Sequence, residues 1–221
     1  MKFNITIYKK DIKNIILKVK NNGKVLLSVP KNTPKKFIDN FLKEKEEWIL
    51  KNIKKFEDFP LKQVDKSYKN GDNIEYLGIK YTLQIFSNSK NSVAINNQNI
   101  SINYSGDFSQ EKIKKLLYNW YKVQASIIFK ETISKYLNLT DETIFQIKIR
   151  KMKTKWGSCR PASKIITLNL ELIKKPIEAI EYVAFHEVAH LKYPHHKKEF
   201  WDFIYLYMKD FKKRKEMLKY V

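Results

Sequence analysis

The sequence predicts an α+β protein with a β-rich N-terminal region that contains one helix, residues 1–105, and a C-terminal region, residues 106–221, built around a metal-binding helix. Three observations support this prediction. With 43% hydrophobic residues, a chain of 221 residues can bury a globular core. Strand-like alternation dominates the first region, and helical spacing dominates the second. All four histidines fall within HEVAHLKYPHH, residues 186–196.

The N-terminal region reads as strands around a single helix. IILKVK and KVLLSVP flank an Asn21-Asn22-Gly23 turn, which is a hairpin signal. Thr33 is a candidate N-cap with Pro34 at the first helical position. Aromatic residues recur at helical spacing after it and are expected to face the core: Phe37, Phe41, Trp48 and Phe56. Further strands are expected in IEYLGIKYTLQIF, SVAIN and ISINY.

The C-terminal region begins with a long helix predicted from about Ser109. FQIKIRKMK then has strand alternation, TKWGSCRPAS is expected to form a turn, and KIITLNL is its return strand. Pro176 can open a helix that stops before Pro194. A final helical region covers KKEFWDFIYLYMKDFKKRKEMLKY.

The composition bounds the environment and the partners. The net charge of +21 comes almost entirely from lysine, because only three of the 44 basic residues are arginine. Such a charge favours polyanions non-specifically, so a basic nucleic-acid-binding module is one hypothesis. The chain has no apolar run long enough to cross a membrane and a single cysteine, so we expect a cytoplasmic protein without disulfides and without a membrane partner.

The histidine-rich stretch contains the spacing of a catalytic metal site. His186 and His190 are four residues apart on the predicted helix, so both imidazoles project from one face. Glu187 follows the first histidine, which completes HExxH. In this motif the histidines bind Zn²⁺ and the glutamate takes a proton from the metal-bound water. The motif therefore predicts a zinc-dependent hydrolase.

Catalytic zinc usually takes three protein ligands and leaves the fourth position to water. His196 is the best candidate for the third ligand, because Pro194 breaks the helix and lets the chain turn back toward the metal. The spacing alone leaves several alternatives open: His195, Glu199, Glu178 and Glu181.

Two segments carry a resemblance to a known family. KTKWGSCRPASKIITLNLELI and YVAFHEVAHLKYPHHKKEFW resemble the YgjP-like metallopeptidase-type family, with its WGSC, short hairpin, HELAH and a histidine shortly before Phe-Trp. VKNNGKVLLSVPKNTPKKFIDNFLKEKEEWI and EYLGIKYTLQI also resemble the N-terminal region of that family. The resemblance covers most of the chain.

This resemblance implies a zincin-like catalytic region with His186, His190 and His196 as ligands and Glu187 as catalytic base. It implies a metallopeptidase, whereas members of the family are also described as nucleoside triphosphate pyrophosphatases acting on UTP. The expected substrate is therefore a peptide or protein, with a nucleotide as the alternative. The chain departs from the family in having His195 where asparagine is common, and Lys164 where glycine is frequent.

Basic residues surround the WGSC segment. Arg150, Lys153, Lys155 and Arg160 form either a solvated strand face or a basic rim that holds an anionic substrate near the metal. Cys159 is expected to be a small core residue rather than a metal ligand, because the histidines already suffice.

Overall fold

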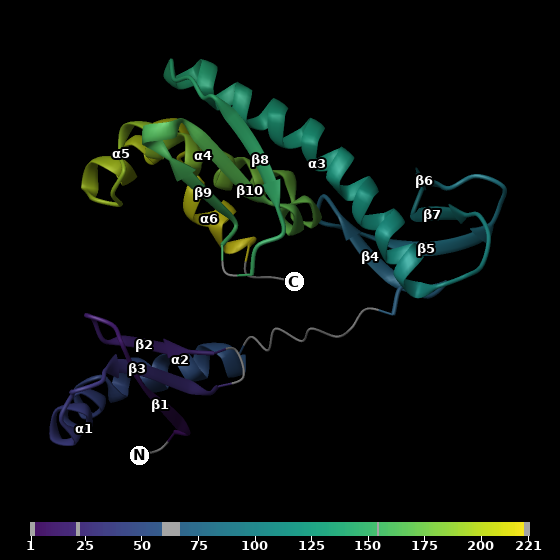
Figure 1. Ribbon diagram of the computed structural model, residues 1–221. Coiled ribbons are helices and arrows are strands. Elements are labelled where there is room, and N and C mark those ends of the chain that lie inside the picture. The colour runs from purple at the N-terminus through teal and green to yellow at the C-terminus, as the bar shows by residue number, and fades with distance from the viewer. Residues whose placement is uncertain (1–2, 21–22, 59–66, 154, 219–221) are drawn as a thin grey trace. The chain divides into compact units, whose positions relative to one another are not determined.

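The computed structural model describes residues 3–20, 23–58, 67–153 and 155–218. The chain divides into two compact units, Met1–Lys66 and Ser67–Val221, each with its own hydrophobic core (Figure 1). None of the described helices combines the length and hydropathy needed to cross a membrane.

The division between the units differs from the boundary expected at residue 105. The strands that precede this position bury Ile100 and Ile102 in the same core as Ile113 and Leu117 of the following helix. The hydroxyl of Tyr121 also donates to a main-chain carbonyl of these strands, at 2.6 Å. Burial of shared apolar surface therefore joins these strands to the C-terminal part of the chain.

The first unit is a three-stranded sheet with two helices. Strand β3 lies in the centre, antiparallel to β2 and parallel to β1. The predicted hairpin of β2 and β3 is confirmed, although Asn21 and Asn22 of its turn lie outside the described residues. The elements are β1 (Ile5–Lys10), β2 (Ile16–Val19), β3 (Val25–Pro30), α1 (Lys35–Glu44) and α2 (Glu46–Asp58).

The single helix expected in this unit is two helices that meet at Lys45. Thr33 does not cap the first one, because its hydroxyl donates to the Pro30 carbonyl at 2.9 Å. The expected aromatic core is confirmed only at Phe41, which packs against the sheet core, because Phe37 and Trp48 are 51% and 47% exposed and the side chain of Phe56 lies outside the described residues. The break changes which side chains face inward, so aliphatic residues cover the sheet instead: Ile38, Leu42 and Ile49.

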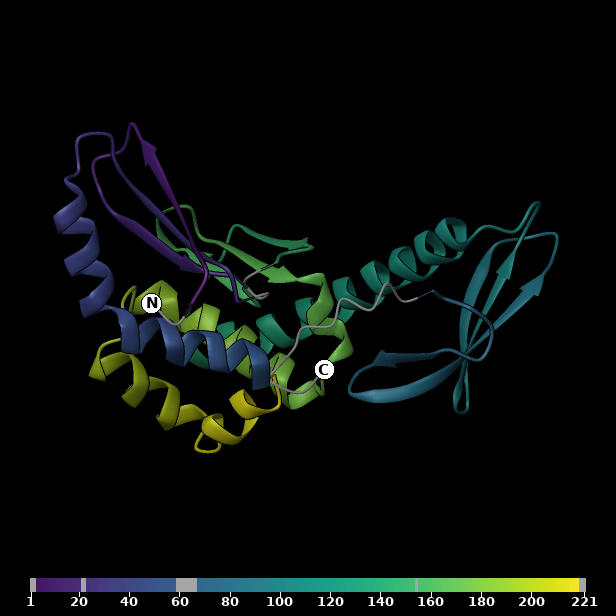
Figure 2. The same ribbon diagram turned by 90° about the horizontal axis from the view of Figure 1, so that it is seen from below.

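The second unit begins with a four-stranded sheet in the order β4-β5-β7-β6. Helix α3 (Gln110–Thr140) runs from this sheet to a second sheet further along the chain (Figure 2). The helix predicted from Ser109 is confirmed, and the Ser109 side chain accepts a hydrogen bond from the Lys112 main chain, which caps the helix. The strands are β4 (Asn73–Tyr76), β5 (Ile79–Ser87), β6 (Ser92–Asn96) and β7 (Asn99–Tyr104).

The second sheet has three strands in the order β8-β10-β9. Its strands are β8 (Gln146–Arg150), β9 (Gly157–Arg160) and β10 (Ile165–Asn169). The expectation that TKWGSCRPAS forms only a turn is wrong, because Gly157–Arg160 in its middle forms strand β9, antiparallel to β10. Gly-Ser-Cys has no apolar alternation, so pairing with β10 decides its conformation. Strands β8 and β10 are parallel.

Three helices complete the unit: α4 (Ile177–Lys192), α5 (Lys198–Tyr207) and α6 (Phe211–Glu216). The start of α4 is fixed by the β4–β5 turn. The main-chain N–H groups of Leu77 and Gly78 donate to the carbonyls of Ile173 and Lys174, each at 3.0 Å. Gly78 has φ +80°, and a Cβ there would lie 2.7 Å from Pro176 Cγ, so only glycine allows this close approach.

Candidate metal centre

Helix α4 places three of the predicted site residues. It starts after Pro176 and ends at Lys192, before the extended backbone of Tyr193. His186 and His190 are one turn apart, and their ring centroids are 4.9 Å apart. Glu187 lies in the same helical turn, but its side chain does not belong to the histidine cluster, and it is only 5% exposed. The HExxH segment is therefore a rigid helix whose polar side chains lie in a largely apolar surrounding.

His196 comes from the irregular segment between α4 and α5 and completes the cluster. Its Nε2 lies 2.9 Å from Nε2 of His186, and its ring centroid lies 4.6 Å from that of His190. One ligand nitrogen from each of the three histidines falls within 4.8 Å of the others. Helix α4 ends before Pro194, and the chain then turns so that the His196 imidazole lies beside the helix, as the sequence predicts.

The other predicted ligands do not join this cluster. Within the described part of the chain, the three histidines are the one group of His, Cys, Asp or Glu side chains close enough to share an ion. His195, Glu199, Glu178 and Cys159 therefore lie outside it. Glu181 is engaged with Lys135 and Arg214.

The surroundings keep two of the imidazoles neutral. Burial, followed by the nearby His190, His196 and Lys215, lowers the pKa of His186 to about 3. Burial also lowers the pKa of His190, against the effect of its hydrogen bond with Tyr193. A neutral imidazole has the free lone pair that a metal ligand needs.

Hydrogen bonds indicate which nitrogens face the centre of the cluster. His190 Nδ1 lies 3.0 Å from the Tyr193 carbonyl, to which it can only donate, so its Nε2 carries the lone pair. Nδ1 of His186 is buried without a partner among the described residues. Three converging nitrogens with no acidic side chain among them fit a divalent ion with a free coordination position.

Glu187 lies against strand β9. A Cβ placed on Gly157 would be 2.6 Å from Glu187 Oε1 and 2.7 Å from its Cγ, so the carboxylate occupies the space that glycine leaves. The Cys159 main-chain N–H donates to the carboxylate. Burial raises the pKa of Glu187 to about 7, against the opposing effects of Lys155 and this hydrogen bond. A carboxylate with this pKa can both take up and release a proton near neutrality.

Asn169 is a site residue that sequence reasoning missed. It is 4% exposed, and its Nδ2 donates to the carbonyls of Met152 and Lys155 at 2.9 and 2.8 Å. Its Oδ1 accepts from the N–H groups of Met152 and Glu171. These bonds hold the segment that leads into β9. No motif or spacing distinguishes this asparagine, because its partners are all main-chain groups.

An aromatic stack supports His196, and its role was also missed. The ring of Trp201 stacks on His196 at 5.6 Å between centroids with 24° between planes. The Trp201 ring also stacks on Phe211 of α6, at 5.7 Å between centroids and 22° between planes. The ammonium of Lys215 lies 5.4 Å from the centre of the Trp201 ring. The third histidine, although exposed, is therefore held by side chains from two further helices.

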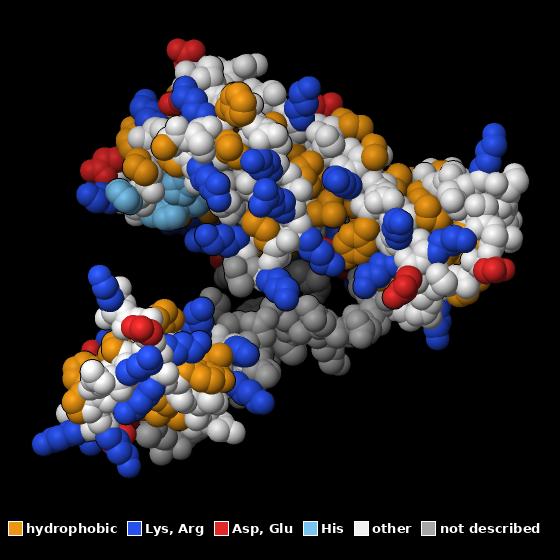
Figure 3. Space-filling view, viewed as in Figure 1, with side chains coloured by type: hydrophobic (Ala, Val, Ile, Leu, Met, Phe, Trp, Pro, Cys, Tyr) orange, Lys and Arg blue, Asp and Glu red, His pale blue; other side chains and the backbone are white. Residues whose placement is uncertain are grey.

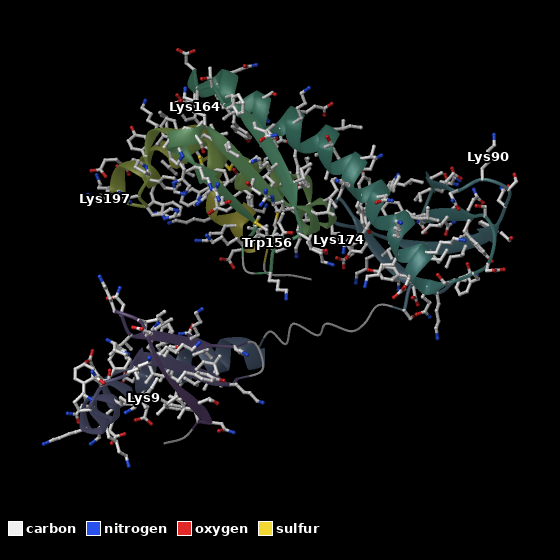
Figure 4. All side chains as sticks on the ribbon, viewed as in Figure 1. Lys9, Lys90, Trp156, Lys164, Lys174 and Lys197 are labelled. Carbon is white, nitrogen blue, oxygen red and sulfur yellow. The ribbon has the colours of Figure 1, made fainter. Side chains whose placement is uncertain are left out.

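The predicted basic rim is spread over the three-stranded sheet. Arg150, Lys153, Lys155 and Arg160 are all exposed. Arg150 and Arg160 pair with opposite ends of β10, so they do not converge on one point. Lys155 is the member whose charge acts on the pKa of Glu187. Figure 4 shows Trp156, which follows Lys155, at the end of this sheet.

An HExxH helix with a third histidine and a buried glutamate defines a metal-dependent hydrolase. The chain matches the family model described as "YgjP-like, metallopeptidase domain" over residues 13–220, and it belongs to the YgjP-like family. The predicted family and the α+β fold are thus confirmed.

Two solved structures are similar to part of the chain. The metallopeptidase zymogen jannalysin of Methanocaldococcus jannaschii is 23% identical, with 41% of this chain and 86% of that chain covered and a TM-score of 0.37. The metallopeptidase zymogen abylysin of Pyrococcus abyssi is 19% identical, with 41% and 90% covered and a TM-score of 0.38. A search of curated proteins found no match.

Proposed function

We propose that this chain is a zinc-dependent peptidase in which His186, His190 and His196 hold the ion and Glu187 is the catalytic base. The observation that carries the proposal is the convergence of three histidine nitrogens within 4.8 Å next to a glutamate that is 5% exposed. Three nitrogen ligands are the usual set for catalytic zinc, which keeps its fourth position for water.

The chemistry is divided between the ion and the chain. Zinc, when bound, supplies a Lewis acid that lowers the pKa of water to about 7 and polarises a carbonyl. Glu187 accepts the proton of the attacking water and returns it to the leaving amine. Its pKa of about 7 suits both transfers at neutral pH. Gly157 and the Cys159 N–H fix the carboxylate in place.

A polypeptide is the substrate that the site favours. Strand β9 is at the edge of its sheet and carries the residues that hold Glu187. An edge strand offers main-chain groups with which an extended peptide can pair. The family description as a metallopeptidase domain supports the same substrate class.

Nucleotide hydrolysis is the second candidate, and the exposed Lys155 beside Glu187 is the observation that favours it. A nucleoside triphosphate is usually bound together with Mg²⁺, which needs carboxylate ligands. Among the described residues no acidic cluster of that kind lies at the centre. We therefore rank this candidate second.

The test compares zinc-loaded wild-type protein with Glu187→Gln on a mixture of an unfolded protein and nucleoside triphosphates, with products identified by mass spectrometry. Peptide fragments that require Glu187, with intact nucleotides, are the expected result. Bound zinc is quantified in both proteins, and we expect equal occupancy. Glu178→Gln, an exposed glutamate on the same helix, serves as the matched control and should cleave normally.

Other outcomes would contradict the proposal. Glu187-dependent hydrolysis of a nucleotide without peptide fragments would replace the peptidase by a nucleotide hydrolase. Undiminished cleavage by Glu187→Gln would remove the glutamate from the mechanism. If His196→Ala still binds zinc fully, His196 is not a zinc ligand.

A further inference from the structure

Two lysines from separate parts of the chain lie beside the metal centre. Lys155 lies two residues before Gly157, and Gly157 is in contact with Glu187. Its main-chain carbonyl accepts a hydrogen bond from the buried Asn169 at 2.8 Å, so the backbone at Lys155 is held in place. Its side chain is exposed and free to reach a bound substrate.

The second lysine belongs to helix α6. The ammonium of Lys215 lies 5.4 Å from the centre of the Trp201 ring, and Trp201 stacks on His196. The cation–π contact directs this ammonium toward the histidine cluster.

Neither of these two lysines is held in an ion pair within the described part of the chain. Figure 3 shows the histidines as one patch, with lysine or arginine side chains and acidic side chains near its border. Lys155 and Lys215 are both exposed, so their charges can meet charged groups of a bound substrate.

We propose that Lys155 and Lys215 select polypeptide substrates that carry aspartate or glutamate next to the scissile bond. This inference rests on the proposed peptidase function and adds a substrate class to it. A substrate carboxylate gains a charge-assisted contact with either ammonium, whereas a lysine or arginine at the same position is repelled. The two lysines lie beside different residues of the centre, Lys155 by Glu187 and Lys215 by Trp201, which suits an extended chain with acidic groups at more than one position.

Binding is measured without cleavage, in the zinc-loaded Glu187→Gln protein. The probes are a fluorescent glutamate-rich peptide and its glutamine counterpart, followed by fluorescence anisotropy. Replacement of both Lys155 and Lys215 by glutamine should weaken binding of the glutamate peptide by about three- to tenfold, since each exposed pair contributes modestly. Binding of the glutamine peptide and of zinc should not change.

The matched control separates this site from the general charge of a +21 protein. Lys213→Gln removes an exposed charge from the same helix as Lys215 and should leave the affinity for the glutamate peptide nearly unchanged. An equal loss of affinity in the Lys213 variant, or no loss in the double variant, would overturn the proposal.

A cleavage experiment distinguishes failure of this inference from failure of the peptidase proposal. Wild-type protein digests a denatured protein mixture, and the new termini are sequenced by mass spectrometry. We expect aspartate and glutamate to be enriched beside the cleaved bonds, and the enrichment to disappear in the double variant. Cleavage without enrichment refutes the lysine selectivity alone. Lysine-dependent binding of a nucleoside triphosphate that is then hydrolysed, with no peptide cleaved, refutes the acidic polypeptide as substrate.

Discussion

At the scale of single residues, the centre depends on how closely helix α4 approaches strand β9. Glu187 fills the space beside Gly157, and the two are not neighbours in the sequence. The sequence shows a glycine at a turn, and its permissive backbone is the obvious explanation there. The structure gives a different reason, because its missing side chain makes room for the catalytic carboxylate.

We expect Gly157→Ala to reduce hydrolysis by about a hundredfold, because the added methyl group displaces the carboxylate. The histidines lie elsewhere, so zinc affinity should stay the same. The measurement combines initial rates on the unfolded protein with zinc competition. Ser158→Ala on the same strand is the control. If Gly157→Ala loses zinc as well as activity, a general distortion of α4 is the better explanation.

Lys164 has a backbone conformation that residues with a side chain rarely adopt. It has φ +49°, in the left-handed region where glycine is favoured. The resemblance to the family already marks this position, since glycine is frequent there. Its Nζ donates to Thr143 Oγ1 at 2.9 Å, but that bond is exposed and contributes little.

Lys164→Gly should therefore stabilise the protein by about 0.5–1 kcal/mol, the left-handed penalty less the extra entropy of glycine in the unfolded chain. Urea denaturation of both proteins measures this difference. Lys164→Ala retains the backbone penalty and should give no gain. A loss of stability in the glycine variant would show that the hydrogen bond of Nζ outweighs the backbone effect.

At the scale of elements, side chains of α5 and α6 support His196, the residue that we propose as the third metal ligand. His196 lies outside any helix, and the ring of Trp201 in α5 packs between it and Phe211 in α6. The sequence places these three residues near the C-terminus without indicating that they stack. Their contact arises only when α5 and α6 fold against α4.

We expect Trp201→Ala to weaken zinc binding by about tenfold, because His196 loses the surface that orients its imidazole. Trp201→Phe keeps an aromatic face and should restore most of the affinity. Zinc competition with a chelating dye measures both variants. Tyr205→Ala, which changes an exposed aromatic residue of the same helix, is the control. Unchanged zinc affinity in Trp201→Ala would show that Trp201 does not orient His196 for zinc binding.

At the scale of the whole molecule, an ion network joins α4 to α3 and α6. Glu181 pairs with Lys135 at 2.6 Å and with Arg214, and Arg214 also binds Asp210. Burial alone raises the pKa of Glu181, but the hydrogen bonds and charges of Lys135 and Arg214 outweigh it and lower the pKa. The helix that carries the HExxH segment is thus joined by ion pairs to α3 and α6.

A lowered pKa makes this network dependent on pH. The ionised carboxylate stabilises the folded state above the unfolded pKa of glutamate, about 4.3, and the contribution is lost as pH falls through the lower folded value. Glu181→Gln should therefore cost about 1–3 kcal/mol at pH 7 and progressively less in more acidic solution. Urea denaturation across this pH range measures the difference. Glu131→Gln, which changes an exposed glutamate of α3, should cost little at any pH. A cost that does not change with pH would argue against the ionic origin.

The sequence by itself determined the α+β class, the long helix α3 and the HExxH helix. These features depend on local spacing and on residue chemistry, which a linear pattern records directly. The boundary between the units, the break at Lys45 and strand β9 were not predictable, since each depends on contacts with distant residues.

Only the tertiary structure decided how the site is assembled. It brought His196 rather than His195 to the helix, placed Glu187 against Gly157, and located Lys215 beside Trp201. Each of these contacts joins segments separated by a turn, a strand or a whole helix. Their distances follow from how apolar faces pack, and packing is a property of the folded chain rather than of any local pattern.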